Sequence, residues 1–389
     1  MHPDVVIVGA GPAGALAATA LARSGARVIL IDPSHPREKA CGGGLTGRAL
    51  ALVAPWHAAD TVASVRITAA RFTARDRSGG VVVPLGAGSG ELVVSSRLHF
   101  DEALMQCAVE AGAQLVRSRV TAIESGPPHV VITRDRQQFS APFVIGADGV
   151  NSVVRRTFTT PFGRDQLSIA TGFYARGITS DEIVLEMVDS PAGYIWSFPR
   201  PDHLAIGICA QATDTSADAL RHIVHTWIER TGLARGARLD AYSWPIPSLP
   251  AAAYQSIPIA GPGWFTVGDA AGLVDPITRE GIYFALRSGL MAADAIGSGV
   301  AEPARVYESR VRDEIGGELA AAATLKAGFF RPEFSELMLD ALETSPRIRA
   351  VMADLVAGTQ PYRTLKRTLV GTLEIGLAWR WLTARQRIA

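Results

Sequence analysis

Three glycines near the N-terminus have the spacing of a turn that binds phosphate groups. The segment Gly9-Ala10-Gly11-Pro12-Ala13-Gly14 follows a short apolar run and opens a stretch rich in Ala and Leu. In such a turn Gly9 permits the tight bend, Gly11 lets the backbone approach a pyrophosphate, and Gly14 lets a helix pack closely on a strand. Asp32 follows 18 residues after Gly14, where its carboxylate can accept hydrogen bonds from a ribose hydroxyl group. These residues predict a bound dinucleotide.

The residues around this turn have the pattern that such a site requires. Residues 4–8 (Asp-Val-Val-Ile-Val) have the composition of a buried parallel strand, and residues 12–24 have that of a helix. Residues 27–31 form a second apolar run, and Gly25 lies where the helix should end. The pattern predicts a strand–helix–strand unit whose helix N-terminus receives the pyrophosphate.

Two later glycine-rich turns distinguish between the dinucleotides. Gly146-Ala147-Asp148-Gly149 and Gly268-Asp269-Ala270-Ala271-Gly272 each follow an apolar strand pattern. FAD is long, so its ribityl chain and ring need loops that are remote in sequence from the first turn. The carboxylate of Asp269 can accept a hydrogen bond from a ribityl hydroxyl group. A helix beginning near Gly281-Ile282 can direct its positive end at the flavin ring, and Arg97 can contact phosphate or ribose. The set predicts FAD, but it does not indicate whether NADPH, NADH or ferredoxin supplies electrons.

The composition excludes other classes of protein. The chain has 389 residues, with 38 Lys and Arg against 37 Asp and Glu, which argues against a nucleic-acid-binding protein. Cys41, Cys107 and Cys209 are widely spaced and form no Cys-x-x-Cys pair, so we expect neither disulfides nor a metal site. No signal peptide or membrane-spanning run is evident, and we expect a cytoplasmic protein.

Several of these segments together resemble a known family. The glycine turn, the Asp148 and Asp269 segments and Arg97 resemble the flavoprotein superfamily of p-hydroxybenzoate hydroxylase. Residues 39–45 (Lys-Ala-Cys-Gly-Gly-Gly-Leu) and 191–199 (Pro-Ala-Gly-Tyr-Ile-Trp-Ser-Phe-Pro) are similar to the flavin-side loop and the Pro-x-x-Tyr-x-Trp-x-Phe-Pro signature of the geranylgeranyl reductase family. The resemblance covers essentially the whole chain. It implies reduction of isoprenoid carbon–carbon double bonds with FAD as cofactor.

The resemblance gives Cys41 a specific place. It puts the Cys41 loop, with Gly42 and Gly43 as cofactor contacts, over the flavin face beside the substrate. An isolated prenyl double bond is not electrophilic, so its reduction needs a proton donor as well as a hydride donor. The thiol of Cys41 is our candidate for that donor. The alternative is that Cys41 is a small buried apolar residue, as cysteines often are.

An aromatic strand is the candidate substrate wall. Tyr194, Trp196 and Phe198 alternate, so they share one face of a strand, and with Pro199 they are our predicted substrate contacts. The alternative is an ordinary sheet core. The family signature continues with Gly-x-Gly, whereas this chain has Gly207-Ile208-Cys209. We expect the added side chain to shorten or redirect a substrate channel.

Apolar residues repeat every fourth position near the C-terminus: Leu365, Leu369, Leu373, Leu377 and Trp381. Basic residues lie off this stripe, which predicts an amphipathic helix. Such a helix either lies on anionic lipid, giving peripheral contact with the inner membrane face, or docks on the body of the protein.

We therefore predict an α/β fold with a Rossmann-like, p-hydroxybenzoate-hydroxylase-like FAD-binding domain. That domain comprises residues 1–60, 97–155 and 258–325; residues 61–96 and 156–257 form a β-rich substrate domain, and residues 326–389 a helical C-terminal region. An FAD-dependent monooxygenase that hydroxylates an aromatic or other small molecule is the main alternative. A flavin-dependent halogenase is disfavoured because it needs a mid-chain lysine, and none lies between Lys39 and Lys326.

Overall fold

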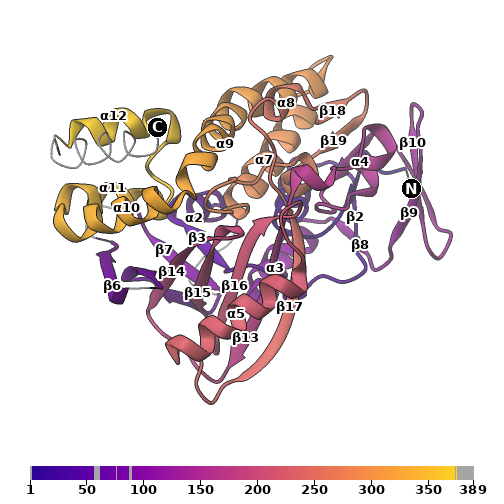
Figure 1. The fold of residues 1–389 in the computed structure, drawn as a ribbon. Helices are drawn as coiled ribbons and strands as arrows, with labels where there is room; N and C mark the ends of the chain where they lie inside the picture. The colour runs from indigo at the N-terminus through magenta and orange to yellow at the C-terminus, as the bar shows by residue number, and fades with distance from the viewer. Residues whose placement is uncertain (1, 57–61, 76, 87–89, 373, 375–389) are drawn as a thin grey trace.

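The glycine turn connects the first strand of a six-stranded sheet to the first helix of the chain (Figure 1). The structure is a computed structural model that describes residues 2–56, 62–75, 77–86, 90–372 and 374. The strand order is β18-β19-β12-β1-β2-β8, and only β18 runs antiparallel to its neighbour. The strands are β1 (Val5–Val8), β2 (Val28–Ile31), β8 (Gln114–Val116), β12 (Phe143–Gly146), β18 (Ala260–Gly261) and β19 (Trp264–Thr266).

Each face of this sheet is covered by a different layer. Side chains alternate between the faces, so Val5 and Ile7 pack against helices, whereas Val6 and Val8 face the other side. The helices are α1 (Pro12–Arg23), α3 (Arg97–Glu110) and α7 (Ile282–Gly297). The second face is covered by β9 (Val120–Glu124), β10 (His129–Thr133), β11 (Gln138–Ala141) and α4 (Val153–Phe158). The predicted strand–helix–strand unit is confirmed by β1, α1 and β2.

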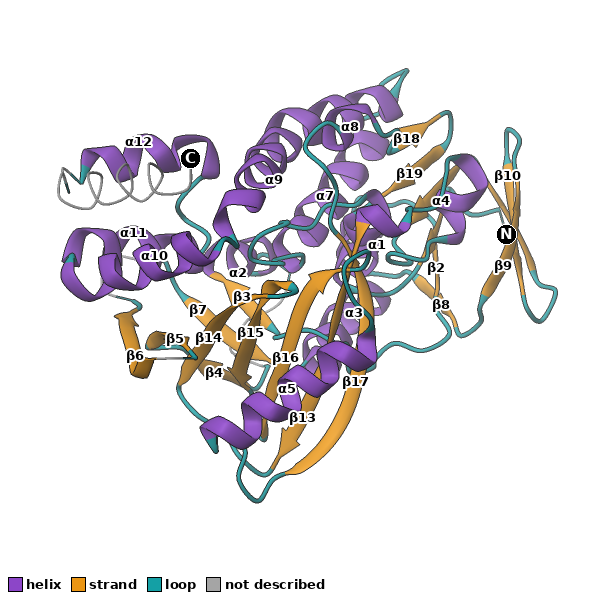
Figure 2. Cartoon of the chain, in the orientation of Figure 1, coloured by secondary structure: helices purple, strands orange, loops and turns teal. Residues whose placement is uncertain are grey.

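A seven-stranded sheet forms the second large layer (Figure 2). Its order is β17-β13-β16-β15-β14-β5-β6, and only β14 and β5 pair in parallel. Its strands are β5 (Ala69–Ala74), β6 (Arg77–Pro84), β13 (Leu167–Arg176), β14 (Glu182–Asp189), β15 (Ala192–Pro199), β16 (His203–Gln211) and β17 (Arg238–Pro247). Helix α5 (Ala217–Thr231) covers one face, where its Trp227 packs against Ile195 of β15. Tyr194 and Trp196 flank Ile195 in β15, so their side chains point to the opposite face of the sheet.

A small sheet joins the two large ones. Its order is β3-β7-β4, with β3 (Gly44–Thr46), β4 (Ser64–Arg66) and β7 (Leu92–Ser95), and α2 (Gly47–Val53) follows β3. Strand β3 belongs to the segment that we assigned to the FAD-binding domain, whereas β4 and β7 belong to the segment that we assigned to the substrate domain. The domain boundaries therefore stay a proposal.

The chain after residue 301 is helical within the described residues, as the sequence predicts. Its helices are α8 (Pro303–Val311), α9 (Gly317–Phe329), α10 (Pro332–Thr344), α11 (Pro346–Val356) and α12 (Tyr362–Gly371), with a π-helical turn at Arg312–Gly316. Short helical segments elsewhere are α6 (Ala253–Ser256), Arg164–Gln166 and Gly268–Ala271. Leu342 of α10 and Ala353 of α11 pack against Phe72 and Val83, so these helices cover the β5–β6 end of the seven-stranded sheet.

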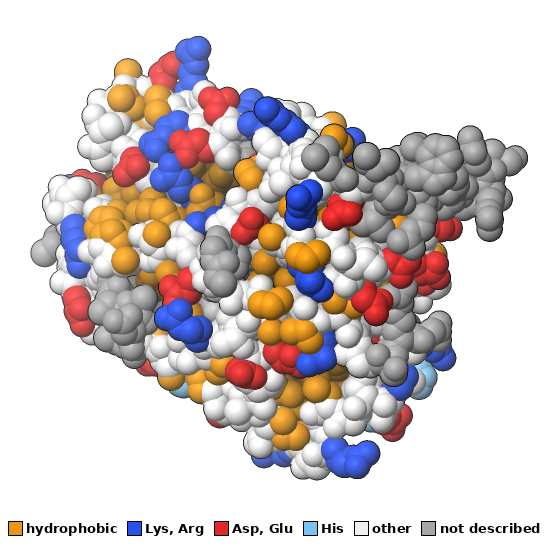
Figure 3. Space-filling model, turned by 90° about the vertical axis from the view of Figure 1, so that its left-hand side faces the viewer, with side chains coloured by type: hydrophobic (Ala, Val, Ile, Leu, Met, Phe, Trp, Pro, Cys, Tyr) orange, Lys and Arg blue, Asp and Glu red, His pale blue; other side chains and the backbone are white. Residues whose placement is uncertain are grey.

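The apolar stripe predicted near the C-terminus extends past the residues that the structure describes. Leu373, Leu377 and Trp381 of the predicted amphipathic helix lie outside the described residues. Within the described residues, no helix has the length and apolar character needed to cross a membrane. Figure 3 shows charged side chains of both signs interspersed among apolar patches on one face, in keeping with a net charge of +1.

Replacement of Gly14 by alanine should disrupt the packing of α1 on the glycine turn. A Cβ atom there would lie 1.9 Å from the carbonyl oxygen of Gly9, which is backbone and cannot rotate away. We expect Gly14→Ala to lower the free energy of unfolding by about 1–3 kcal/mol, as overpacking does, and to reduce FAD retention. Gly297→Ala is the control, because the nearest atom to its Cβ, Ser24 Oγ, is 3.9 Å away. Urea unfolding followed by circular dichroism checks both variants, and equal stability would contradict the packing argument.

Candidate active site

One cavity of about 750 Å³ brings together most of the residues identified from the sequence. Its walls come from both large sheets and from the C-terminal helices. The sequence-derived residues that line it are Gly9, Gly11, Pro12, Ala13, Asp32, Cys41, Gly42, Gly43, Arg97, Asp148, Tyr194, Trp196, Phe198, Gly268, Asp269, Gly281 and Ile282. Gly14 and Pro199 are not among the lining residues; Gly14 packs inside the turn, and Pro199 ends β15.

The glycine turn leaves room for a ligand at the start of α1. Gly9 has a φ of +104°, in the region that favours glycine, and a Cβ there would lie 2.4 Å from the carbonyl oxygen of Ala147. A Cβ on Gly11 would meet no atom closer than 3.6 Å, so this residue borders open space. No side chain caps the N-terminus of α1, and its first turn contains no acidic residue. Its free N–H groups are therefore available to an anionic group such as pyrophosphate.

Asp32 holds the glycine turn to the loop after β2. Its carboxylate accepts hydrogen bonds from the backbone N–H groups of Ala10 (2.9 Å), Ser34 (2.7 Å) and His35 (2.7 Å), and His35 Nδ1 lies 2.8 Å away. Burial alone would raise the pKa of Asp32, but His35 and these N–H groups hold it well below its usual range. The side chain thus has a structural task within its own chain. The expected bond to a ribose hydroxyl stays a prediction.

His35 extends this contact into a line of alternating charges. Its Nε2 atom lies 3.4 Å from Asp101, which accepts two hydrogen bonds from Arg97 at 2.8 and 2.7 Å. Burial alone would lower the pKa of His35, but the two flanking carboxylates raise it above the ordinary value, which favours the protonated imidazole. Sequence reasoning did not identify His35 or Asp101, because no short motif connects residues on different elements.

The donors and acceptors around the cavity fit FAD. Asp148 Oδ2 accepts a 2.6 Å hydrogen bond from the N–H group of Val153, whereas its buried Oδ1 has no partner among the described residues. Burial raises the pKa of Asp148 to about 6, and a hydroxyl donor would satisfy the free oxygen. Helix α7 begins at Ile282, with Gly281 as its N-cap, and both residues line the cavity, so its positive end is available to the electron-rich edge of a flavin ring.

Two ion pairs connect cavity loops that are far apart in sequence. Lys39 Nζ lies 2.8 Å from Asp269 Oδ2, and Arg48 pairs with Glu280 directly before α7. Thr46 Oγ1 also donates to Glu280, at 2.9 Å. Burial raises the pKa of the Glu280 carboxyl group, while Arg48 and Thr46 act against that rise. Sequence reasoning did not assign these pairs, because each joins residues more than 200 positions apart.

The Cys41 loop packs closely on the aromatic strand. Cys41 lines the cavity and is partly exposed, and its Sγ accepts a hydrogen bond from the N–H group of Gly43 at 3.3 Å. A Cβ on Gly42 would lie 2.9 Å from the ring of Phe198, so glycine is required there. Phe198 therefore supports the loop in addition to lining the cavity.

The rest of the aromatic strand forms a fixed wall. Tyr194 donates a 2.7 Å hydrogen bond to the carbonyl oxygen of Thr278, and burial raises its pKa above the usual value. Trp196 lies across Gly207, where a Cβ would be 2.5 Å from the indole. Cys209, which replaces the second glycine of the family signature, is completely buried and is not among the cavity-lining residues. The expectation that its side chain shortens the channel is therefore not supported by its position.

The C-terminal helices close the cavity from the remaining side. Met352 and Leu355 of α11 and Tyr362 of α12 are lining residues. Tyr362 donates a 2.8 Å hydrogen bond to Oδ2 of Asp275. The Oδ1 atom of Asp275 accepts hydrogen bonds from the backbone N–H groups of Ile277 and Thr278. This bond ties the C-terminal region to the loop that leads into α7.

The raised pKa of His35 predicts a pH-dependent contribution to stability. Because its folded-state pKa lies above the ordinary value of 6.5, the stabilisation is complete below pH 6.5 and is lost as the pH rises through the folded-state pKa. We expect His35→Gln to cost about 2 kcal/mol at pH 6 and less at higher pH. Melting temperatures of both proteins between pH 6 and 9 check this, and a difference independent of pH would show that His35 is uncharged.

Comparison with known proteins places this geometry in a family. Residues 2–232 match the FAD binding domain family model. The chain is 31% identical over 363 residues to a digeranylgeranylglycerophospholipid reductase from Methanothrix thermoacetophila, covering 85% of this chain and 88% of the relative. It is 31% identical over 307 residues to a geranylgeranyl diphosphate reductase from Rhodobacter capsulatus, covering 76% of this chain and 75% of the relative.

A solved structure has the same fold. The crystal structure of a geranylgeranyl bacteriochlorophyll reductase-like protein from Thermoplasma acidophilum superposes with a TM-score of 0.79 at 22% identity, covering 95% of this chain and 99% of that one. The predicted α/β fold and the FAD cofactor are thereby confirmed. The chain belongs to the geranylgeranyl reductase family of FAD-dependent oxidoreductases.

Proposed function

We propose that this protein reduces carbon–carbon double bonds of an isoprenoid group. The observation that carries the proposal is that Cys41 and the aromatic residues Tyr194 and Trp196 line the same cavity as the FAD-binding turns. The relatives named above act on geranylgeranyl compounds, which supports a substrate of this class. The head group and chain length of the substrate are left open by this argument.

The lining away from the glycine turn suits a hydrocarbon chain. It includes Phe72, Ile183, Leu185, Met187, Phe329, Met352 and Leu355. These side chains can bury a prenyl chain and exclude water, and each buried CH₂ group contributes about 0.8 kcal/mol to binding. Tyr194, held by Thr278, and Trp196, held over Gly207, keep the wall rigid.

Bound FAD, once reduced by an external electron donor, would supply the hydride, so the task left to the protein is to place the alkene and deliver a proton. We assign the proton to the Cys41 thiol, because it lines the cavity and is partly exposed there. Tyr194 is a poorer candidate for the donor. Its hydroxyl proton is engaged with the Thr278 carbonyl, and burial raises its pKa.

The activity is tested without oxygen. Dithionite-reduced protein is mixed with geranylgeranyl diphosphate or a digeranylgeranylglycerophospholipid, and flavin reoxidation is followed by absorbance. Product mass should rise by two hydrogens for each bond reduced. Failure of both substrates to reoxidise the flavin would refute the proposal, and oxygen consumption coupled to a hydroxylated product would establish the monooxygenase alternative.

Contact with lipid is a second part of the proposal. A prenylated lipid must leave a membrane or a carrier to enter the cavity. The predicted amphipathic helix, whose apolar stripe begins in α12 and whose basic residues lie off that stripe, is our candidate for peripheral contact. Flotation of the full chain with anionic vesicles tests this contact, and absence of vesicle binding at low salt would refute it.

Trp196→Ala should weaken substrate binding while FAD stays bound. Removal of the indole takes away a large apolar contact, so we expect KM for a prenyl substrate to rise about tenfold or more. The visible spectrum of the flavin should change little. Loss of bound FAD would instead make Trp196 a structural core residue.

Cys41→Ala should abolish most turnover but leave the fold intact. A positioned proton donor contributes roughly 10²–10⁴-fold to a rate, whereas removal of this small side chain costs about 1 kcal/mol of stability. Cys41→Ser should be impaired as well, because a hydroxyl is a weaker acid. Single-turnover reoxidation by a prenyl substrate is the measurement.

Cys107→Ala is the matched control for this variant. Cys107 is buried on α3 and does not line the cavity, so its removal should leave turnover unchanged. A parental rate in Cys41→Ala would exclude Cys41 from the chemistry.

A further inference from the structure

Arg200 holds the Cys41 loop from the side away from the cavity. It follows β15 directly, and its side chain is completely buried. Its Nη2 atom donates a 2.5 Å hydrogen bond to the carbonyl oxygen of Cys41, and its Nη1 atom forms an ion pair with Glu38. Arg200 is not one of the cavity-lining residues. The Cys41 carbonyl group therefore points toward a side chain that lies outside the cavity lining.

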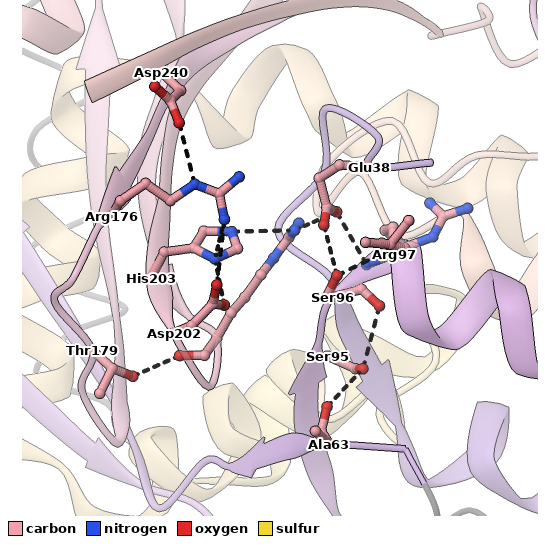
Figure 4. A network of polar contacts seen from close by, with 12 residues as sticks. Glu38, Ala63, Ser95, Ser96, Arg97, Arg176, Thr179, Asp202, His203 and Asp240 are labelled. Carbon is pink, nitrogen blue, oxygen red and sulfur yellow. Dashed lines mark hydrogen bonds and ion pairs between the residues drawn. The ribbon is translucent and has the colours of Figure 1, made fainter. Parts of the chain in front are cut away.

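Glu38 carries this contact to the helix that bears Arg97. Figure 4 shows Glu38 facing Ser96 and Arg97, where it accepts hydrogen bonds from Ser96 Oγ at 2.6 Å and from the Arg97 N–H group at 3.1 Å. Burial alone would raise the pKa of Glu38, but the charge of Arg200 and these donors lower it. The Arg200–Glu38 pair thus joins the seven-stranded sheet, the Cys41 loop and the start of α3.

The other end of the same network does not reach the loop. His203 lies 3.5 Å from Arg200 and 2.7 Å from Asp202, and burial lowers its pKa. Arg176 contacts His203, Asp202 and Asp240, as Figure 4 shows, and it has no described bond to the Cys41 loop. Arg176 is therefore a matched control for Arg200.

The bond from Arg200 determines where the next N–H group points. In a planar trans peptide the C=O and N–H groups point in opposite directions. Because the Cys41 carbonyl points toward Arg200, the N–H group of Gly42, which is a cavity-lining residue, points away from Arg200. The Gly43 N–H group is already donated to Cys41 Sγ, but within the described residues the Gly42 N–H group has no acceptor. A backbone donor in this position requires an acceptor from a ligand or water.

We propose that Arg200 is a positioning residue that fixes the peptide between Cys41 and Gly42, so that the Gly42 N–H group donates a hydrogen bond to an acceptor atom of the flavin ring. The same restraint sets the direction of the Cys41 thiol. The inference depends on bound FAD and not on the isoprenoid substrate of the proposed function, and the two can therefore fail separately.

The test compares variants of the FAD-loaded protein. Arg200→Met alone would leave the partly buried Glu38 carboxylate without its cation, which is destabilising, so the main variant is the double change Arg200→Met with Glu38→Gln. Arg200→Lys keeps the charge but loses the planar, two-pronged donor geometry. Arg176→Met is the control. The readouts are the reduction potential of the bound flavin and the rate of Cys41 alkylation by iodoacetamide, located by mass spectrometry.

We expect the double variant to keep FAD and to show a lower flavin reduction potential. Without the Gly42 N–H donor in place, the electron-rich reduced ring is stabilised less than in the parent protein. The rate of Cys41 alkylation should change about tenfold, as expected for loss of one hydrogen bond to a charged group. Arg200→Lys should lie between the double variant and the parent, and Arg176→Met should match the parent. Parental values in both Arg200 variants would overturn the proposal, and so would equal effects of Arg176→Met, which would assign the change to general loosening of the network.

Discussion

A buried line of alternating charges holds the cofactor turn in place. Asp32 binds the turn and His35, His35 contacts Asp101, and Asp101 binds Arg97 with two hydrogen bonds. All four side chains are nearly inaccessible to solvent, so removal of one would leave a neighbouring charge buried without compensation. The line runs from the end of β2 to the first turn of α3. The strand, the glycine turn and the helix therefore keep one arrangement relative to one another.

The Cys41 loop depends on this line at one end and on the second sheet in its middle. It leaves His35, passes over Phe198 and Arg200, and enters β3 of the small sheet. The loop and the aromatic wall are thus fixed to the same strand, β15. A thiol and a hydrophobic wall that share one support keep a constant spacing, which a reaction between a held alkene and a proton donor requires.

The sequence predicted the parts of the site that are local. The glycine turn could be identified because Gly9, Gly11 and Gly14 lie within one turn, and the aromatic wall because alternation alone puts Tyr194 and Trp196 on one face. The contacts that orient these parts could not be identified. Arg200 with Glu38, and Lys39 with Asp269, pair across segments that only the tertiary fold brings together.

The position of a residue in the sequence also does not show whether other groups of the same chain already bind its side chain. The rule that places a carboxylate at the end of the second strand identified Asp32, but it gives no sign that four donors from the same chain already bind that carboxylate. Likewise, Pro199 belongs to the aromatic signature, yet side chains alternate along β15, so Pro199 lies on the face opposite Phe198 and does not line the cavity. Local patterns give residue type and place, whereas the partners of a side chain are set by packing.

The order of strands in the first sheet has a consequence for synthesis on the ribosome. Neighbouring strands β1, β12 and β19 are translated far apart in time, and α7, whose N-terminus borders the cavity, follows β19. At elongation rates of about 5–20 residues per second, the first strand waits roughly 15 s or longer for the residues that complete the cofactor site. β2 follows soon after and pairs with one edge of β1, but the other edge has no partner until β12 is made, and such an exposed edge is open to pairing elsewhere. The cavity that receives the cofactor is therefore complete only after about three quarters of the chain has been made.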